Sequence, residues 1–430
     1  MVHYSGEISC RLEVDAMKNF PRTTKLKNRD NRNLIYKFYP GFSEDFVEDV
    51  IKILNVSTDE IILDPWNGSG TTTYVASKLG IPSIGLDINP VMSIIASARL
   101  FNIETNPYNA DYLLKLSDKF RTNVEQDDAL CNWFHKDTVT IIRNIERTIF
   151  DGKYLREVIV NNEYSNLQAF YCLILFNVVK HLAHDLKSSN PTWIKKPIST
   201  ERKSFTKAEI DEIYLNEYKR LVQVYEHNKV HQAVNPKIII GRSESIPLDN
   251  SSVETVITSP PYCTRIDYAI MTSLELAIFN ISEIDFVKLR HSLIGAPVIH
   301  KKIPKVIREW GPTCLETLSK IENHDSKASR SYYLKTYLQY FHSIFLSLKE
   351  IDRVMKNDGK CVIVIQNSYY KDIFIDLKQI FIEMINYFGW RLLDTYEFIN
   401  PNNLAEINPR GKEYRESSTT KEYAVIFKKW

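Results

Sequence analysis

The sequence predicts an α/β fold built on a mostly parallel sheet. Short apolar stretches that suit buried strands alternate with helical patterns over residues 43–100, and the alternation resumes at residue 237. Strand, helix and strand in this order give parallel strands joined by right-handed crossovers. The composition agrees with a globular fold, since 44% of the residues are hydrophobic and 25% are charged.

The first elements make up an N-terminal segment and the first part of the sheet domain, over residues 1–100. The stretch SEDFVEDVIKIL predicts a helix behind the N-cap Ser43, and EIILDP predicts a short buried strand. A glycine-rich turn and a helix follow in NGSGTTTYVASKLG. A second strand is then predicted in PSIGLDINP, and another helix in PVMSIIASARL.

Residues 101–236 are predicted to form a mainly helical insertion, because long helical patterns fill them and strand patterns are few. One of its helices opens with the capping box Thr206/Glu209. The remainder of the sheet domain is expected over 237–430, with a loop-rich insertion at about 282–329. It contains, in order, the strands KIIIG and VETVITSPP, the helix YYLKTYLQYFHSIFLSLKEIDRVM, the strand CVIVI, the helix DLKQIFIEMINYFG and the strands WRLLDTYEFI and EYAVIFKK.

Composition excludes several classes of protein. The longest apolar run, Phe170 to Val179, is too short to cross a bilayer, and the N-terminal stretch contains acids and no apolar core, so it is no signal peptide. Six cysteines are scattered singly, without a close Cys/His cluster, which argues against a metal site and against a disulfide scaffold. We therefore expect a cytoplasmic chain with no metal and no membrane contact.

Basic residues gather in three stretches, although the net charge is only +2. The three clusters are Lys18, Arg22, Lys25, Lys27, Arg29 and Arg32; Lys187, Lys195, Lys196, Arg202, Lys203 and Lys207; and Lys301, Lys302, Lys305 and Arg308. With Trp193 and Trp310 among them, these cations favour contact with a nucleic-acid backbone. Ordinary solvated loops are the alternative interpretation.

Two predicted strands end in residues that suit a small-molecule ligand. After the first, Asp64 supplies an acceptor, and Gly68 and Gly70 in DPWNGSGTT let the backbone approach a ligand closely. The loop lacks the Lys-Ser/Thr pair of a P-loop and the full GxGxxG spacing. After the second strand, Asp87 can accept hydrogen bonds from two ribose hydroxyls. Ordinary crossover turns remain the alternative for both stretches.

A third strand ends abruptly in the diproline stretch VITSPPYCTRIDY. Proline cannot continue a central strand, so the loop is rigid, and the Ser259 hydroxyl and a nearby carbonyl become fixed acceptors. Acceptors suit an exocyclic amine, and Tyr262 offers a flat face for stacking a base. A simple strand-ending loop is the alternative. Cys263 has no Pro-Cys context, so a structural role is favoured.

Together these stretches resemble the DNA amino-methyltransferases, which use S-adenosylmethionine to methylate cytosine N4 or adenine N6. DPWNGSGTT is similar to the family's DPFxGSGTT cofactor loop, with Trp66 in the aromatic position. GLDINP is similar to its ribose-binding acidic motif, and TSPPY to its catalytic Asp/Asn/Ser-Pro-Pro-Tyr/Phe motif. IYKFYPGF, from Ile35 to Phe42, resembles the segment that closes over methionine, and KNDGKCVIVIQNSYY the fifth-strand region.

The resemblance implies a Rossmann-like seven-stranded methyltransferase sheet, mostly parallel with an antiparallel last strand, plus a helical insertion. It implies S-adenosylmethionine as cofactor, bound by Phe38, Pro40, Asp64, Trp66, Gly68, Gly70 and Asp87. It implies that the flipped base is held by Ser259, Pro260, Pro261 and Tyr262. One departure is Arg242, which follows Gly241 where the family often has an acid, so Ser243 or Glu244 takes that place.

The implied reaction is direct, in-line transfer of a methyl group to a base amine, without a covalent intermediate. Serine in the first position of the diproline motif is commoner in cytosine-N4 enzymes, so cytosine N4 is favoured over adenine N6. An RNA guanine-N2 methyltransferase and a non-catalytic DNA-binding module are weaker alternatives.

Double-stranded DNA is the implied partner, and residues 101–236 or 282–329 are expected to recognise the target. Family habit implies the modification enzyme of a restriction–modification system, with a cognate restriction endonuclease that acts separately. The sequence indicates no oligomeric state.

Overall fold

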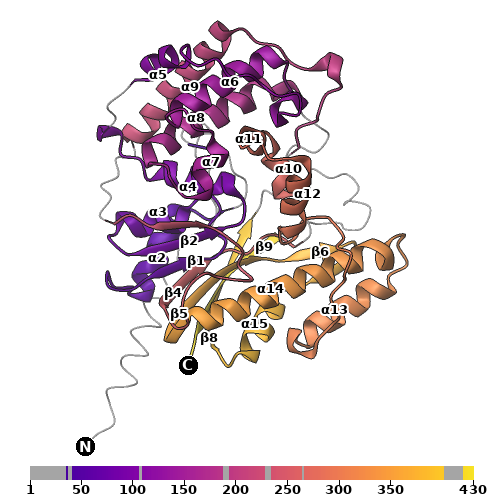
Figure 1. Cartoon of the computed structure of the whole chain (residues 1–430). Coiled ribbons are helices and arrows are strands. Elements are labelled where there is room, and N and C mark those ends of the chain that lie inside the picture. The colour runs from indigo at the N-terminus through magenta and orange to yellow at the C-terminus, as the bar shows by residue number, and fades with distance from the viewer. Residues whose placement is uncertain are drawn as a thin grey trace, which may run out of the picture.

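The computed structural model describes residues 35–36, 41–105, 109–186, 193–227, 234–263, 266–400 and 420–430. These residues form a seven-stranded sheet in the order β3-β2-β1-β4-β5-β9-β8 (Figure 1). The strands are β1 (Ile62–Asp64), β2 (Ser83–Asp87), β3 (Lys237–Ile240), β4 (Val253–Thr258), β5 (Met355–Gln366), β8 (Arg391–Asn400) and β9 (Thr420–Lys428). β9 runs antiparallel to β5 and β8 and lies between them. The predicted parallel sheet with an antiparallel last strand is therefore confirmed.

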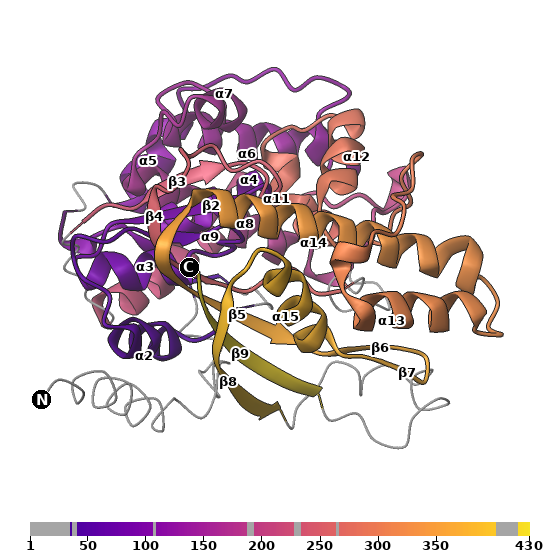
Figure 2. The ribbon, with the colours of Figure 1, turned by 90° about the horizontal axis from the view of Figure 1, so that it is seen from below.

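Helices cover both faces of this sheet. On one face lie α2 (Glu44–Leu54) and α3 (Thr71–Lys78), and on the other α13 (Pro312–Asn323), α14 (Leu334–Val354) and α15 (Leu377–Tyr387), which lie next to one another in Figure 2. Alternate residues of the strands serve the two faces, so Ile62 and Leu63 enter different cores. As predicted, Ser43 caps α2, because its hydroxyl accepts a hydrogen bond from the Phe46 N–H at 3.1 Å.

Between β2 and β3 the chain forms a group of helices, which Figure 1 shows away from α14 and α15. They are α4 (Pro90–Arg99), α5 (Ala110–Ser117), α6 (Lys136–Ile149), α7 (Leu155–Val160), α8 (Asn166–Leu182) and α9 (Lys207–His227). The apolar run Phe170 to Val179 lies in α8 and is largely buried. The predicted capping box is present before α9, where the Thr206 N–H donates to Glu209 at 2.7 Å.

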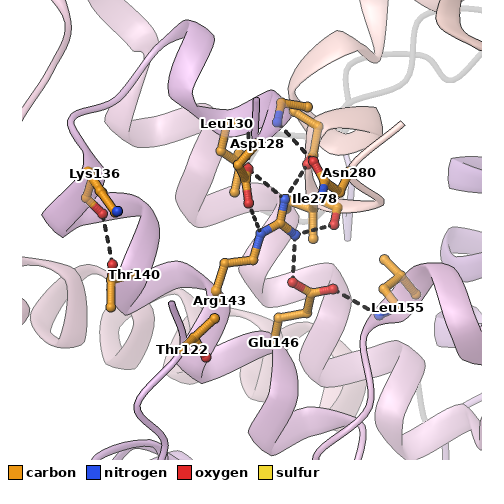
Figure 3. A network of polar contacts seen from close by, with 12 residues as sticks. Thr122, Asp128, Leu130, Lys136, Thr140, Arg143, Glu146, Leu155, Ile278 and Asn280 are labelled. Atoms are coloured by element: carbon orange, nitrogen blue, oxygen red, sulfur yellow. Dashed lines mark hydrogen bonds and ion pairs between the residues drawn. The ribbon is translucent and has the colours of Figure 1, made fainter. Parts of the chain in front are cut away.

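A buried arginine joins these helices to the segment that follows the diproline stretch. Figure 3 shows Arg143 of α6 between the carboxylates of Asp128 and Glu146, at 2.8 Å and 2.6 Å. The same guanidinium donates to the carbonyls of Ala277 and Ile278, at the end of α11. Because the paired charges satisfy one another, burial of this arginine is tolerated, and it fixes α6 against α11.

The segment 282–329, which the sequence predicts to be loop-rich, contains two helices. These are α12 (Glu283–Ser292) and α13, which begins with a proline in its first turn. For α12 the pattern gives no signal, because its apolar residues spread around the helix and none of its residues is buried, whereas α13 buries Cys314, Thr317, Leu318 and Ile321.

The remaining elements are short. They are α10 (Tyr268–Met271), α11 (Ser273–Ile278), the hairpin of β6 (Ser368–Tyr370) and β7 (Ile373–Ile375), 3-10 helices at Ile103–Thr105, Ala129–Asn132, His184–Leu186, Ser199–Glu201 and Arg308–Trp310, and a π-helix at Ser329–Tyr333. Among the residues that the structure describes, no helix has the length and hydropathy needed to span a membrane.

Candidate active site

The carboxyl ends of β1, β2 and β4 border a cleft of about 970 Å³, including its open mouth. Most of the residues predicted from the sequence line it: Asp64, Trp66, Gly68, Asp87, Ser259, Pro260, Pro261 and Tyr262. Phe38 and Pro40 lie outside the described residues, whereas Gly41 and Phe42 line the cleft.

Gly70 does not line the cleft, although the resemblance implies contact with the cofactor. Its backbone has a φ of +81°, and a Cβ atom there would lie 2.7 Å from the Cβ of Ala96 in α4. Glycine is therefore needed at this position for the turn and for the packing of α3 against α4.

Asp64 joins the ends of two strands at the floor of the cleft. Its carboxylate accepts hydrogen bonds from the Thr258 hydroxyl at 2.6 Å, the Thr72 hydroxyl at 2.7 Å and the Trp66 N–H at 3.1 Å. Burial raises the pKa of Asp64 to about 6, and the three donors act against that rise. Thr258 precedes Ser259, so this carboxylate also fixes the start of the diproline stretch.

Asp87 ends β2 and faces the glycine-rich loop. Its two carboxylate oxygens accept hydrogen bonds from the Gly68 N–H at 3.0 Å and the Asn89 N–H at 2.8 Å. Burial raises the pKa of Asp87 to about 6, and the nearby charge of Asp64 acts in the same direction. Each oxygen keeps lone pairs, so this side chain can accept further hydrogen bonds from a ligand.

The diproline stretch is held from both sides by tyrosines. The Pro261 carbonyl accepts a hydrogen bond from the Tyr340 hydroxyl at 3.1 Å, and the Tyr262 N–H donates to the Tyr268 hydroxyl at 3.3 Å. The Ser259 hydroxyl donates to the Val364 carbonyl at 3.0 Å. Its only proton is thus engaged, so towards a ligand this hydroxyl acts as an acceptor.

A second cavity, of about 290 Å³ with its opening, lies on the other side of the diproline stretch. It is lined by Ser259, Pro260, Pro261, Tyr262, Cys263, Tyr340, Val364, Ile365, Gln366, Leu377 and Glu422. Since β4 lies between β1 and β5, the cleft is on the β1 side of the stretch and this cavity is on the β5 and β9 side. No local sequence pattern indicated Tyr340, Gln366 or Glu422, because each lies in an ordinary helix or strand pattern.

Arg242 stands where the family often has an acidic residue, and its neighbours Ser243 and Glu244 each have a polar partner. Arg242 forms two hydrogen bonds with the Glu244 carboxylate, at 3.2 Å and 3.1 Å, while the buried Ser243 hydroxyl is 2.8 Å from the Ser347 hydroxyl. All three residues line the cleft, beyond the end of β3. Ser243 therefore has a packing partner of its own, and Arg242 and Glu244 form the polar pair on that side.

The two described basic clusters differ in their charge partners. In the first, Lys196 pairs with Glu283 at 3.3 Å, and Lys203 pairs with Asp185 at 3.1 Å. In the second, the exposed cations form no ion pair with a described residue; they are Lys301, Lys302, Lys305 and Arg308. The loop that carries them is anchored by Gln339, which accepts from the His300 N–H and donates to the Val298 carbonyl. The cluster at residues 18–32 lies outside the described residues.

Comparisons with known proteins agree with the geometry. A family model for a DNA methylase matches residues 16–97. The Type II methyltransferase M.BsoBI of Geobacillus stearothermophilus is 27% identical over 309 residues, which is 66% of this chain and 59% of that protein. M.AvaI of a Nostoc species is 24% identical over 387 residues, covering 80% and 76% of the two chains. M.MvaI of Kocuria varians is 22% identical over 402 residues, covering 85% and 84%.

These matches confirm the resemblance to the DNA amino-methyltransferases, and methyltransferase relatives imply S-adenosylmethionine as the methyl donor. The cleft fits that molecule. Two carboxylates suit its hydroxyl and cationic groups, and apolar side chains suit its adenine ring: Phe42, Ile88, Met92, Leu293 and Ile294. The buried Trp66 indole N–H has no partner among the described residues, so a donor also remains for an acceptor atom.

Proposed function

Because the chain is similar to the DNA amino-methyltransferases, we propose that it moves a methyl group from S-adenosylmethionine to cytosine N4 in double-stranded DNA. The observation that carries this proposal is the Ser259 hydroxyl, which donates to the Val364 carbonyl and faces two cavities on either side of the diproline stretch. A rigid acceptor between a cofactor cleft and a second cavity suits an amine that must be presented to a methyl donor.

The amine of cytosine is a poor nucleophile, because its lone pair is delocalised into the ring. Ser259 and the Pro260 carbonyl would accept its two hydrogens and favour a pyramidal nitrogen with an available lone pair. The Pro261 carbonyl is already engaged by Tyr340, which leaves the Pro260 carbonyl as the one of the pair with no partner among the described residues. When bound, S-adenosylmethionine supplies the methyl group as an electrophile. The residues of the stretch accelerate transfer by positioning and by fixed dipoles.

The base must leave the double helix to reach this stretch. Flipping costs a few kcal/mol, roughly what stacking on one aromatic ring returns. Tyr262 lines both cavities and offers such a ring. On the cofactor side, Asp87 would accept from the ribose hydroxyls, and Asp64 and Gly68 would lie along the methionine part.

Cytosine N4 is favoured over adenine N6 because serine occupies the first position of the diproline motif. Plasmid DNA methylated by the purified protein, digested to nucleosides and analysed by mass spectrometry, separates the two products. N4-methylcytosine is the expected product. N6-methyladenine would establish the alternative, and unmodified DNA with intact cofactor binding would indicate a non-catalytic DNA-binding module.

The exposed cluster at residues 301–308 is the better candidate for contact with DNA phosphates, because its charges have no described acidic partner. Replacing Lys301, Lys302 and Lys305 with alanine should weaken DNA binding. The slope of log K against log salt is negative, and each lost phosphate contact reduces its magnitude by about 0.9, so the loss of three contacts reduces it by about 3. Alanine at Lys196 and Lys203, which are already paired, is the matched control. An unchanged slope would exclude this loop as a phosphate contact.

The relatives' names as Type II methyltransferases support a role as the modification enzyme of a restriction–modification system. Under this proposal a cognate endonuclease acts separately on the same DNA, in the prokaryotic cytoplasm. Digestion of methylated plasmid with restriction enzymes of known target identifies the protected site. Plasmid that stays sensitive to all of them would argue against a target within their range.

A further inference from the structure

A buried ion pair joins α12 to the segment that follows the diproline stretch. Arg290 of α12 donates from Nε to the Asp267 carboxylate at 2.5 Å, and Figure 1 shows α12 next to α10, which Asp267 precedes. The Asp267 side chain is fully buried, whereas that of Arg290 is 29% exposed. The other oxygen of Asp267 caps α10, because it accepts from the Ile270 N–H at 3.2 Å. One carboxylate therefore holds both helices.

This carboxylate lies one residue away from a contact with the diproline stretch. The hydroxyl of Tyr268, the residue after Asp267, accepts a hydrogen bond from the Tyr262 N–H at 3.3 Å. Tyr262 lines both cavities, and under the proposed function its ring stacks on the flipped base. One ion pair and one hydrogen bond thus connect α12 with the residue that receives the base.

The buried pair is the contact that sets the orientation of α12. No residue of this helix is buried, and its half-buried Phe286 and Leu289 pack against the group of helices between β2 and β3. Apolar packing has no preferred direction, whereas a charge-assisted hydrogen bond does. Another ion pair of α12, between Glu283 and Lys196 at 3.3 Å, is exposed on both sides, and such pairs contribute little.

The chain continues from α12 into the loop with the exposed basic cluster at residues 301–308. The ring of His300 lies 5.5 Å from that of His291, at the end of α12, and the His300 N–H donates to Gln339 of α14 at 2.8 Å. The start of the loop is therefore held between the two helices. Under the proposed function this loop contacts DNA phosphates, so the buried ion pair lies between the bound duplex and Tyr262.

We propose that Arg290 and Asp267 are positioning residues, whose ion pair fixes the loop that contacts DNA relative to Tyr262; this inference rests on the proposed function. A duplex bound at the loop is then placed so that the target base enters beside the diproline stretch. Binding of the duplex and entry of the base are separate steps, and the ion pair acts on the second.

The first test compares Arg290→Gln with the wild type on a duplex that carries the target found by methylation mapping. 2-Aminopurine beside the target base brightens when its stacked neighbour leaves the helix, and this signal should be largely lost. The single-turnover rate of methylation should fall about 10²-fold, as for a misplaced substrate. DNA affinity and its salt dependence should not change, because the lysines of the basic cluster remain.

Cofactor affinity separates positioning from damage to the cleft. Ser292, at the end of α12, lines the cleft, and its hydroxyl accepts from Arg242 at 3.4 Å, a contact that Arg290→Gln leaves in place. The dissociation constant for S-adenosylmethionine, measured by calorimetry, should therefore change far less than the rate.

The conservative variant and a control on the same helix complete the experiment. Arg290→Lys keeps a cation that can reach Asp267, so its rate should be at least about tenfold above that of Arg290→Gln. Lys288→Gln removes only an exposed pair with Asp285, at 2.9 Å, and should match the wild type.

Thermal unfolding shows whether each variant folds. If Arg290→Gln does not fold, its combination with Asp267→Asn leaves no unpaired buried charge and should fold with the same defect in base entry.

Three results would overturn the inference. One is wild-type base entry and rate in the folded variant without the ion pair. Another is a loss of DNA or cofactor affinity as large as the loss of rate, which would make the pair merely structural. The third is a rate for Arg290→Lys no higher than that for Arg290→Gln. A wild-type protein that binds DNA but shows neither base entry nor methylation would instead overturn the proposed function itself.

Discussion

The two cavities beside the diproline stretch differ in how their walls are assembled. The cleft takes its carboxylates from the ends of neighbouring parallel strands, and Asp87 binds the Gly68 N–H only 19 residues away in the chain. The second cavity combines β4, β5, β9 and α14, and its contacts join residues such as Ser259 and Val364, which are 105 apart. Under the proposed function, neighbouring strand ends supply the carboxylates of the cofactor side, although Asp64 also accepts from Thr258, 194 residues away, and the base side depends on the strand order of the whole sheet.

This difference predicts separate effects of substitution. Changes on the cleft side should alter cofactor affinity, and changes on the other side should alter transfer to the base. A variant on one side that changed the quantity assigned to the other side would contradict this division.

Ser259→Ala should have the largest effect. Removing a fixed partner of the reacting group costs about 10²–10³-fold in rate, so single-turnover methylation should fall by that factor. Cofactor affinity, measured by calorimetry, should change far less, because the Ser259 hydroxyl donates to Val364, which lines the second cavity. Ser252→Ala, at the opposite end of β4, is the control. A large loss of cofactor affinity would show that the two sides are not separable.

Asp87→Asn should weaken cofactor binding without changing DNA affinity. The asparagine keeps the shape but has one acceptor oxygen, and hydrogen bonds to charged groups contribute about 1.5–3 kcal/mol. The dissociation constant for S-adenosylmethionine should therefore rise by roughly 10- to 150-fold. Asp59→Asn, on an exposed loop, is the control. Unchanged cofactor affinity would remove Asp87 from the binding site.

The pH dependence of cofactor affinity tests the cleft alone. Burial raises the pKa of Asp87 to about 6, so the carboxyl is charged above that pH and neutral below it. The neutral form is a poorer acceptor, so the dissociation constant should rise by up to about tenfold for each pH unit below the pKa. Calorimetry across this range measures the change, and Asp87→Asn should show a smaller one. Tighter binding in acid would contradict the assignment.

The same raised pKa values make the free energy of unfolding fall as pH rises, whereas cofactor affinity is expected to rise with pH. Between the unfolded carboxyl value of about 3.9 and about 6, the folded protein binds more protons at Asp64 and Asp87 than the unfolded chain does. The contribution of these two groups to the free energy of unfolding therefore falls as pH rises through that window. Denaturant unfolding of the wild type and Asp87→Asn should show a smaller fall in the variant.

The smallest effects are expected from substituting the two tyrosines that hold the diproline stretch, Tyr340 and Tyr268. Tyr340→Phe removes the hydrogen bond to the Pro261 carbonyl, and Tyr268→Phe removes the acceptor of the Tyr262 N–H. Each bond contributes about 1 kcal/mol, or about fivefold. Tyr340→Phe should slow methyl transfer, whereas Tyr268→Phe should also weaken cofactor binding, because its ring lines the cleft. Identical effects of both variants would mean that the stretch acts as one unit.

Much of the fold was predictable, because strand and helix patterns are local. The order of elements, the antiparallel last strand and the capping box at Thr206 follow the predicted pattern. α12 was missed because it has no apolar face, and the close approach of Gly70 to Ala96 was not predictable because Ala96 belongs to another helix. The first is a limit of the local pattern, and the second concerns a packing partner in another element.

The sequence alone determined the chemistry at the ends of three strands: an aspartate with a glycine-rich turn, a second aspartate and a diproline stretch. Their roles depend on local backbone geometry, and parallel strands bring their carboxyl ends to one edge. Only the tertiary structure decided that Tyr340 and Glu422 line the same cavity as Ser259. The physical reason is that strand order places β9 beside β5, and no local pattern of residues records which strands become neighbours.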